Sequence, residues 1–384
     1  MSIHSSRGLR ASALWASVAV AALTISPANA VLIQTQGPVS FTGTDSVTAS
    51  QSGVGTTSAA KSSTFASKSI SQFNGSTGVL TGVKVDLSSS RTETAVLNAS
   101  GGSGGSRRAD GAGTGTNTLL TAPGISQSLN DLNIASFKCQ PSGLTCPSTM
   151  TSGAIATSAN ASSSSLGSYV GAGNVTVDLT GDIGATAKIE SVSSGSPFTS
   201  ASTNNSVNWS GNLSIDYSYL AHANASFDPA SDQDVLNVNF GTVLQGSGTY
   251  TQQFALTNLY STLLASDTVG LDLDSITGPN GTPFSLTGET FSNLGAGLTS
   301  NLFDLTFDSA NIGSFTDKIL LNLSDFDAGA GILNYVLTIN LSGDVVLPPP
   351  PPSNSVPEPA SLALLGSGLF AMGSIRRSKR RKAN

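Results

Sequence analysis

Hydrophobic and polar residues alternate along many short segments of the chain between residues 31 and 346. Val83–Leu87, Val175–Leu179 and Leu213–Tyr219 each place apolar side chains on one face and polar side chains on the other, which is the period of a half-buried strand. Clusters of Gly, Asn, Asp and Ser separate these segments and favour turns. The pattern continues in the segments Leu236–Phe240, Leu302–Phe307, Ile319–Leu323 and Leu333–Leu341. It predicts an all-β fold with two β-sandwich domains, immunoglobulin-like or jelly-roll-like.

Two segments interrupt the alternation, residues 99–118 and residues 147–168, and both consist almost entirely of Ser, Gly, Ala and Thr. Because such small side chains bury little apolar area, both segments are predicted to be long Gly/Ser-rich loops. Arg107 and Arg108 lie in the first of them. We interpret this pair either as a contact for sugar or phosphate or as solvated charge at a loop tip.

The first 30 residues have the organisation of a secretory signal peptide. Arg7 and Arg10 form a basic region, Ala11–Ile25 is mostly apolar, and Ala28 and Ala30 supply the small residues that signal peptidase accepts. We expect cleavage after Ala30 and export of the remainder. The alternative is an N-terminal membrane anchor.

The C-terminal end has three parts in a fixed order. A proline-rich spacer covers residues 347–355, an apolar stretch runs from Ala360 to Ile375, and a basic cluster follows. As a helix, the apolar stretch rises about 24 Å, slightly less than a hydrocarbon core of about 30 Å. The cluster consists of Arg376, Arg377, Lys379, Arg380, Arg381 and Lys382. Such charges stay in the cytoplasm, so a transmembrane helix is predicted over residues 360–375 with the body outside.

Between the spacer and the apolar stretch stands the sequence Val356, Pro357, Glu358, Pro359. With this sequence, residues 356–384 resemble the sorting signal of the PEP-CTERM proteins of Gram-negative bacteria. The resemblance implies that an exosortase, a membrane-embedded transpeptidase-like enzyme, reads and processes the tail. It also implies an inner-membrane-anchored precursor, a final place at the cell surface or in the extracellular matrix, and a role with exopolysaccharide in biofilms. The alternative is a single-pass anchor with a chance Pro-Glu-Pro.

The body resembles two kinds of β-domain found beside bacterial sorting signals. Residues 31–225 are similar to choice-of-anchor E domains in the pieces Ile70–Val83 and Ser210–Tyr219, although the Pro of that family's turn is absent. Residues 235–346 are similar to choice-of-anchor D domains in Phe240–Gly246 and in the Phe and Gly positions that follow. Both resemblances imply β-sandwiches without known catalysis.

Charge is distributed unevenly between these two parts. The chain has 17 Lys and Arg against 23 Asp and Glu, and residues 189–346 contain 15 acidic residues and a single basic one, Lys318. Nucleic acid is excluded as a partner because its phosphates need Lys and Arg. Three Asp-x-Asp pairs are weak candidate ligands for Ca²⁺, which prefers oxygen donors. They are Asp232, Asp234, Asp272, Asp274, Asp325 and Asp327. The alternative interpretation is a solubilising acidic surface.

Histidine and cysteine are scarce. His4 and His222 are the only histidines, so the exported chain lacks the residues for a zinc centre built on several histidines, and His222 is expected in a surface loop. Cys139 and Cys146 are the only cysteines, and in an oxidising periplasm they are predicted to form a disulfide, with free thiols as the alternative.

These observations favour an exported structural or adhesive protein that is not an enzyme and holds no cofactor. One alternative is a carbohydrate-binding module tethered to the envelope, which needs an aromatic platform from Trp209, Tyr217 or Tyr219. A second alternative is a secreted hydrolase of unknown type.

Overall fold

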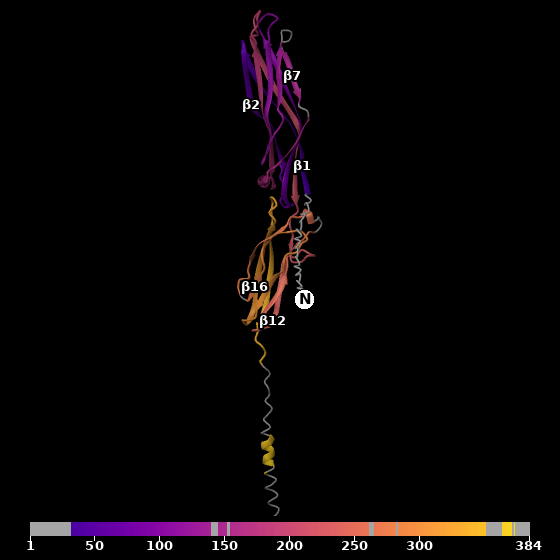
Figure 1. Cartoon of the computed structure of the whole chain (residues 1–384), viewed down its shortest axis with the longest axis vertical. Helices are drawn as coiled ribbons and strands as arrows, with labels where there is room; N and C mark the ends of the chain where they lie inside the picture. Colours follow the sequence, from indigo (N-terminus) through magenta and orange to yellow (C-terminus); the bar gives the residue numbers. More distant parts are fainter. Residues whose placement is uncertain are drawn as a thin grey trace, which may run out of the picture.

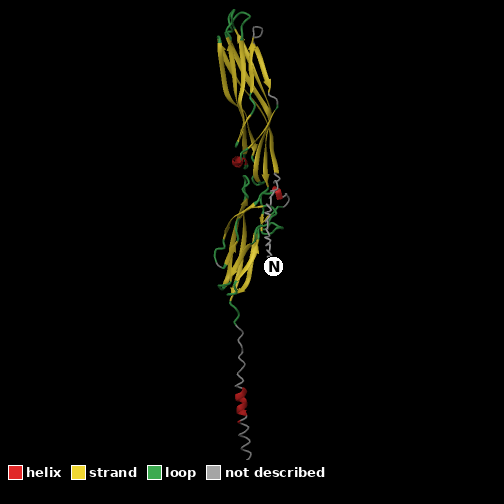
Figure 2. Ribbon diagram, viewed as in Figure 1, coloured by secondary structure: helices red, strands yellow, loops and turns green. Residues whose placement is uncertain are grey.

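The chain forms two strand-rich units stacked end to end, followed by a C-terminal tail (Figures 1 and 2). The computed structural model describes residues 32–139, 145–151, 154–260, 265–281, 283–350, 363–370 and 372. The first unit contains strands β1 to β10 and the second contains β11 to β20. The prediction of an all-β chain is confirmed.

The first unit has two five-stranded sheets. Sheet I has the order β1 (Leu32–Ser52), β10 (Ser200–Leu220), β3 (Val79–Ser100) and β7 (Thr145–Thr151), with β8 (Ile155–Asn160) also beside β3. Sheet II has the order β2 (Gly55–Ser71), β9 (Asn174–Ile189), β4 (Ala109–Ala122) and β5 (Ile125–Ser128), with β6 (Leu132–Cys139) also beside β4. The sheets face each other, since the rings of Phe65 on β2 and Trp209 on β10 lie 5.6 Å apart.

Strand β10 is the central strand of sheet I. It pairs antiparallel with β1 from Ser52↔Ser200 to Leu32↔Tyr219 and with β3 along its whole length. Its side chains alternate as the sequence predicts: Leu213 and Ile215 are buried, whereas Asn212 is exposed. The alternation therefore places one continuous apolar stripe against sheet II.

The prediction of long Gly/Ser-rich loops is wrong for most of residues 99–118 and 147–168. The first segment contains the end of β3 and most of β4, with a loop between them, and the second contains parts of β7, β8 and the 3-10 helix η1 (Ser163–Tyr169). Gly113 and Gly115 lie at buried positions of β4. A Cβ atom on Gly113 would stand 2.7 Å from Oδ1 of Asn205, and one on Gly115 would stand 2.9 Å from Nη2 of Arg91. The glycines therefore leave space for large polar side chains from sheet I.

These polar side chains form a buried layer inside the first unit. Arg91 donates from Nη2 to the Gly115 carbonyl at 3.0 Å and lies 5.9 Å from the Trp209 ring. Asn205 Nδ2 donates to Glu93 Oε1 at 2.6 Å. Burial raises the pKa of Glu93 more than its contacts with Asn205 and Arg91 lower it. The apolar residues of the first unit form one large core that contains its aromatic side chains Phe41, Phe65 and Trp209 and two smaller clusters that contain alanine.

The second unit is built around a five-stranded sheet III and a three-stranded sheet IV. Sheet III has the order β12 (Val235–Leu244), β20 (Asn334–Val346), β19 (Gly313–Asp325), β15 (Leu271–Thr277) and β17 (Phe291–Leu294). Sheet IV has the order β13 (Thr249–Phe254), β18 (Phe303–Asp308) and β16 (Phe284–Thr287). The short strands β11 (Ala225–Ser226) and β14 (Thr257–Asn258) pair with each other, and η2 (Ala265–Asp267) is a 3-10 turn. Strands β12 and β20 pair in parallel.

Phenylalanine fills the core of the second unit. The ring of Phe307 lies 5.3 Å from that of Phe240 and 5.0 Å from that of Phe284, and Ile319 and Leu321 of β19 belong to the same core. Val79 of the first unit also belongs to this core. The two units are therefore continuous in their apolar packing.

Strand β20 ends at the pole of the second unit that lies opposite the first unit, and the chain continues outward from there (Figure 1). Residues 363–370 and 372 are helical, and their side chains are exposed. Among the described residues, no helix is long and apolar enough to cross a membrane. The expected transmembrane segment, residues 360–375, lies partly outside the described residues, and the signal peptide, residues 356–359 and the basic cluster lie wholly outside them.

Replacing Gly113 by Val should lower the free energy of unfolding of the first unit by about 1–3 kcal/mol, because the added side chain overpacks the space that Asn205 occupies. Denaturant-induced unfolding followed by circular dichroism measures the change. Ala112→Val is the matched control, since Ala112 is the residue of β4 directly before Gly113 and is only half-buried. Equal destabilisation by both substitutions would contradict this account of the glycines.

Candidate functional site

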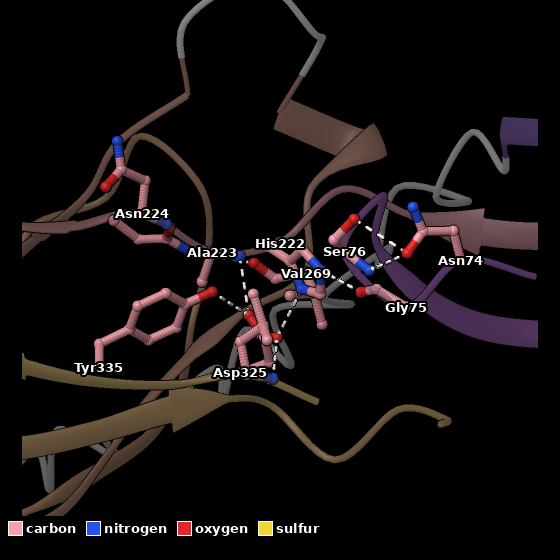
Figure 3. Close-up of polar contacts among 11 residues, drawn as sticks. Asn74, Gly75, Ser76, His222, Ala223, Asn224, Val269, Asp325 and Tyr335 are labelled. Atoms are coloured by element: carbon pink, nitrogen blue, oxygen red, sulfur yellow. Dashed lines mark hydrogen bonds and ion pairs between the residues drawn. The ribbon is translucent and has the colours of Figure 1, made fainter. Parts of the chain in front are cut away.

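A polar cluster joins the two units where the chain passes from one to the other (Figure 3). His222 lies in the connection between β10 and β11. Its Nδ1 atom is 2.8 Å from Oδ2 of Asp325, the last residue of β19. Its Nε2 atom is 2.7 Å from the carbonyl oxygen of Gly75, in the turn between β2 and β3. One imidazole thus contacts both units.

Asp325 is the centre of this cluster. Its side chain is 0% exposed. Oδ1 accepts hydrogen bonds from the Ala223 amide at 2.9 Å and the Tyr335 hydroxyl at 2.9 Å. Oδ2 accepts from the Leu333 amide at 2.8 Å and faces His222. A buried carboxylate needs such partners, and four groups around its two oxygens satisfy an ionised side chain.

The geometry favours the charged form of His222. A carbonyl oxygen and a carboxylate only accept hydrogen bonds, so both contacts are satisfied when each ring nitrogen carries a proton, as in an imidazolium. Burial lowers the pKa of His222, but the hydrogen bond and charge of Asp325 and the Gly75 carbonyl raise it more, so the pKa lies above its ordinary value of 6.5. Burial and the Asp325 carboxylate raise the pKa of Tyr335, which keeps its hydroxyl a donor.

Backbone contacts surround the polar cluster. Leu80 and Ala330 exchange two amide-to-carbonyl hydrogen bonds of 2.8 and 2.9 Å across the junction. A Cβ atom on Gly329 would stand 2.0 Å from the Leu80 carbonyl oxygen, a separation that no side chain tolerates. The backbones of the two units therefore approach as closely as glycine permits.

The sequence interpretation missed this junction in two ways. His222 was expected in a surface loop, but it is half-buried between the units. Asp325 and Asp327 were expected to present two carboxylates together, but β19 ends at Asp325, so the alternation of a strand does not continue to Asp327. Asp325 is buried and Asp327 is exposed.

The other Asp-x-Asp pairs lie on the surface of the second unit. Asp272 accepts hydrogen bonds from the Ser292 hydroxyl and the Asn293 amide, and Asp274 accepts one from the Ser324 hydroxyl. Asp232 and Asp234 are exposed before β12. The described part of the chain contains no group of three or more His, Cys, Asp or Glu that could hold a metal ion.

The two cysteines form a disulfide with a Cα–Cα distance of 5.6 Å. Cys139 ends β6 of sheet II, and Cys146 lies in β7 of sheet I. The bond therefore links the two sheets of the first unit covalently, which no argument from the short sequence separation predicted.

Three residues that the sequence suggested for sugar contacts, Trp209, Tyr217 and Arg107, instead make contacts within the fold. Trp209 and Tyr217 are 0% exposed, so neither forms a binding platform. The Arg107 guanidinium donates to the carbonyl oxygens of Gly101, Gly102 and Gly104 and lies 5.1 Å from the Phe198 ring. Arg107 thus holds its own loop together.

Comparison with known proteins identifies the tail. Residues 355–381 match the PEP-CTERM protein-sorting motif, which confirms the sorting signal predicted from the sequence. No curated protein shows significant similarity to the chain. A solved structure, Vibrio cholerae VesB protease, aligns at 15% identity with a TM-score of 0.22, over 35% of this chain and 37% of that chain, and this similarity supports no conclusion.

Replacing Asp325 by Ala should lower the free energy of unfolding of the second unit by about 3–5 kcal/mol, because the buried imidazolium and three donors lose their acceptor. Urea-induced unfolding measures the change. The matched control is Asp327→Ala, which removes an exposed carboxylate from the same pair and should change the stability by less than about 0.5 kcal/mol. Similar stability of the two variants would show that the Asp325 cluster does not hold the junction.

Proposed function

We propose that this chain is a structural or adhesive protein of the cell surface or extracellular matrix, delivered by its C-terminal signal. The match of residues 355–381 implies an exported protein that an exosortase sorts, and this match is the observation that carries the proposal. The body is assigned no catalytic activity and no cofactor. Its two units are proposed to be choice-of-anchor E-like and choice-of-anchor D-like sandwiches.

An elongated body whose two units are joined supports the structural role (Figure 1). The two units are joined by the Asp325 cluster, by the paired backbones of Leu80 and Ala330, and by packing of Val79 into the second core. The tail leaves from the pole farthest from the first unit (Figure 1). A body held in this way presents the first unit at a distance from whatever the tail is attached to.

The route to the surface follows from the two ends of the sequence. Signal peptidase removes residues 1–30 at the small residues Ala28 and Ala30. The apolar stretch 360–375 and the basic cluster hold the precursor at the inner membrane, with the body outside. The exosortase then acts at or near Pro357, Glu358 and Pro359. The composition of the spacer supports this step, because consecutive prolines favour an extended backbone that would keep the motif away from the folded body.

The place of the protein in an exopolysaccharide or biofilm matrix is part of the proposal. Outward-facing positions of sheet I carry hydroxyl and amide groups, for example Thr48 and Asn204, whose side chains are joined by a hydrogen bond of 2.9 Å. Such groups are compatible with contacts to the hydroxyls of a polysaccharide. Trp209 and Tyr217 are buried, and Tyr219 is partly buried against the first core, so a carbohydrate-binding role is proposed to use this face.

Expression of the full chain in a host with an exosortase should yield a mature protein that lacks the apolar stretch and the basic cluster, because the enzyme cleaves at or near the Pro-Glu-Pro signature. Mass spectrometry of the C-terminal peptide measures where the chain ends. The variant Glu358→Ala should retain the unprocessed terminus, whereas Pro350→Ala, outside the matched residues, should be processed normally. An intact Asn384 terminus of the unsubstituted chain in the surface fraction would overturn the sorting role.

A further inference from the structure

The hydrogen bond from His222 to the Gly75 carbonyl oxygen joins the two units and requires a proton on Nε2 of the imidazole ring. Asp325 and the Ala223 amide fix the connection around His222 to the second unit. From there, Nε2 reaches across to the Gly75 carbonyl of the first unit. The side chain of His222 is 13% exposed, so the ring can exchange its protons with solvent.

The groups around His222 favour its charged form. Asp325 approaches from β19 and Tyr335 from β20, where its hydroxyl donates to Asp325. Asp267 of η2 lies beside the residue before His222, since the backbone carbonyl of Asp267 accepts a hydrogen bond from the Ala221 amide at 2.7 Å. The first unit faces His222 with the turn around Gly75, whose neighbours Asn74 and Ser76 do not titrate. The charged groups named here are all acidic.

Loss of one proton affects the two contacts of His222 unequally. A neutral imidazole has one N–H, and the other ring nitrogen carries a lone pair. The N–H stays with the negative Asp325, because a charge-assisted hydrogen bond is stronger than one to a neutral carbonyl. The Nε2 lone pair then faces the lone pairs of the Gly75 oxygen at 2.7 Å, and this contact becomes repulsive.

We propose that His222 is a pH-sensitive latch that holds the turn of residues 74–77 against the second unit while its ring is charged and releases that turn when the ring loses a proton. The pKa of His222 is raised above 6.5 by its partners in the folded chain. The latch is therefore fully engaged below about pH 6.5 and is lost as the pH rises through the raised value. Its release loosens the junction around the paired backbones of Leu80 and Ala330, while the packing of Val79 into the second core keeps the units connected.

Hydrogen exchange of the purified full chain tests the latch. Exchange is followed by mass spectrometry at about pH 5.5 and about pH 9, which lie on either side of the titration of an imidazole. Each exchange rate is corrected for the effect of pH on the exchange of an unprotected amide. The amides of Thr77, Leu80 and Ala330, which are hydrogen-bonded at the turn and junction, should lose protection by about tenfold at the higher pH. Amides in the interior of β9 and β10 serve as the internal control and should not change.

The variant His222→Gln supplies the matched control, because its side-chain amide donates a hydrogen bond but does not titrate. Its junction amides should show the same protection at both pH values. Loss of protection at the higher pH in this variant, or constant protection in the unsubstituted chain, would overturn the latch. The β9 and β10 amides report whether the variant is folded.

A second measurement needs no substitution at the junction. The variant His4→Ala leaves one imidazole in the chain, so its NMR titration belongs to His222 alone. A midpoint above 6.5 is expected, and a midpoint at or below 6.5 would overturn the proposal, because the partners would then not favour the charged ring.

Discussion

The arrangement of the two units depends on one buried carboxylate. The side chain of Asp325 has no exposure to solvent, and each of its two oxygens has two polar partners, as a buried carboxyl group requires. Those partners come from the connection between the units, from the segment before β20 and from β20 itself. The carboxylate thereby ties the connection to the second unit, and His222 extends that tie to the first.

Close backbone approach makes this polar cluster effective. Gly329 allows the segment after β19 to lie directly against Leu80, and a Cβ atom on Gly75 would stand 2.9 Å from Cγ1 of Val170. Within the first unit, Gly113 and Gly115 of β4 serve a similar purpose for Asn205 and Arg91. In both places, small residues allow buried polar groups to meet their partners, and the hydrogen bonds then hold the backbones in one arrangement.

The tail and the body have separable roles. The sorting motif matches residues 355–381, beyond the last strand of the body, whereas the two units of the body are joined at their junction. Strand β20 ends at the pole of the second unit opposite the first unit, so the first unit is the part of the body farthest from the point where the tail begins (Figure 1). A pH-dependent latch between the units would change how stiffly that distant part is held.

Local patterns in the sequence determined the strands and the sorting signal. The period of two in Leu213–Tyr219 predicts a strand with one buried face because each residue's orientation follows from its neighbours in the chain. The contiguous Pro357, Glu358 and Pro359 identify the signal for the same reason. The Gly-rich segment and the junction needed the tertiary structure. Gly113 faces Asn205 of another sheet, and His222 meets Asp325, 103 residues later. No local pattern encodes such partners, because burial and protonation depend on which distant groups the fold brings into contact.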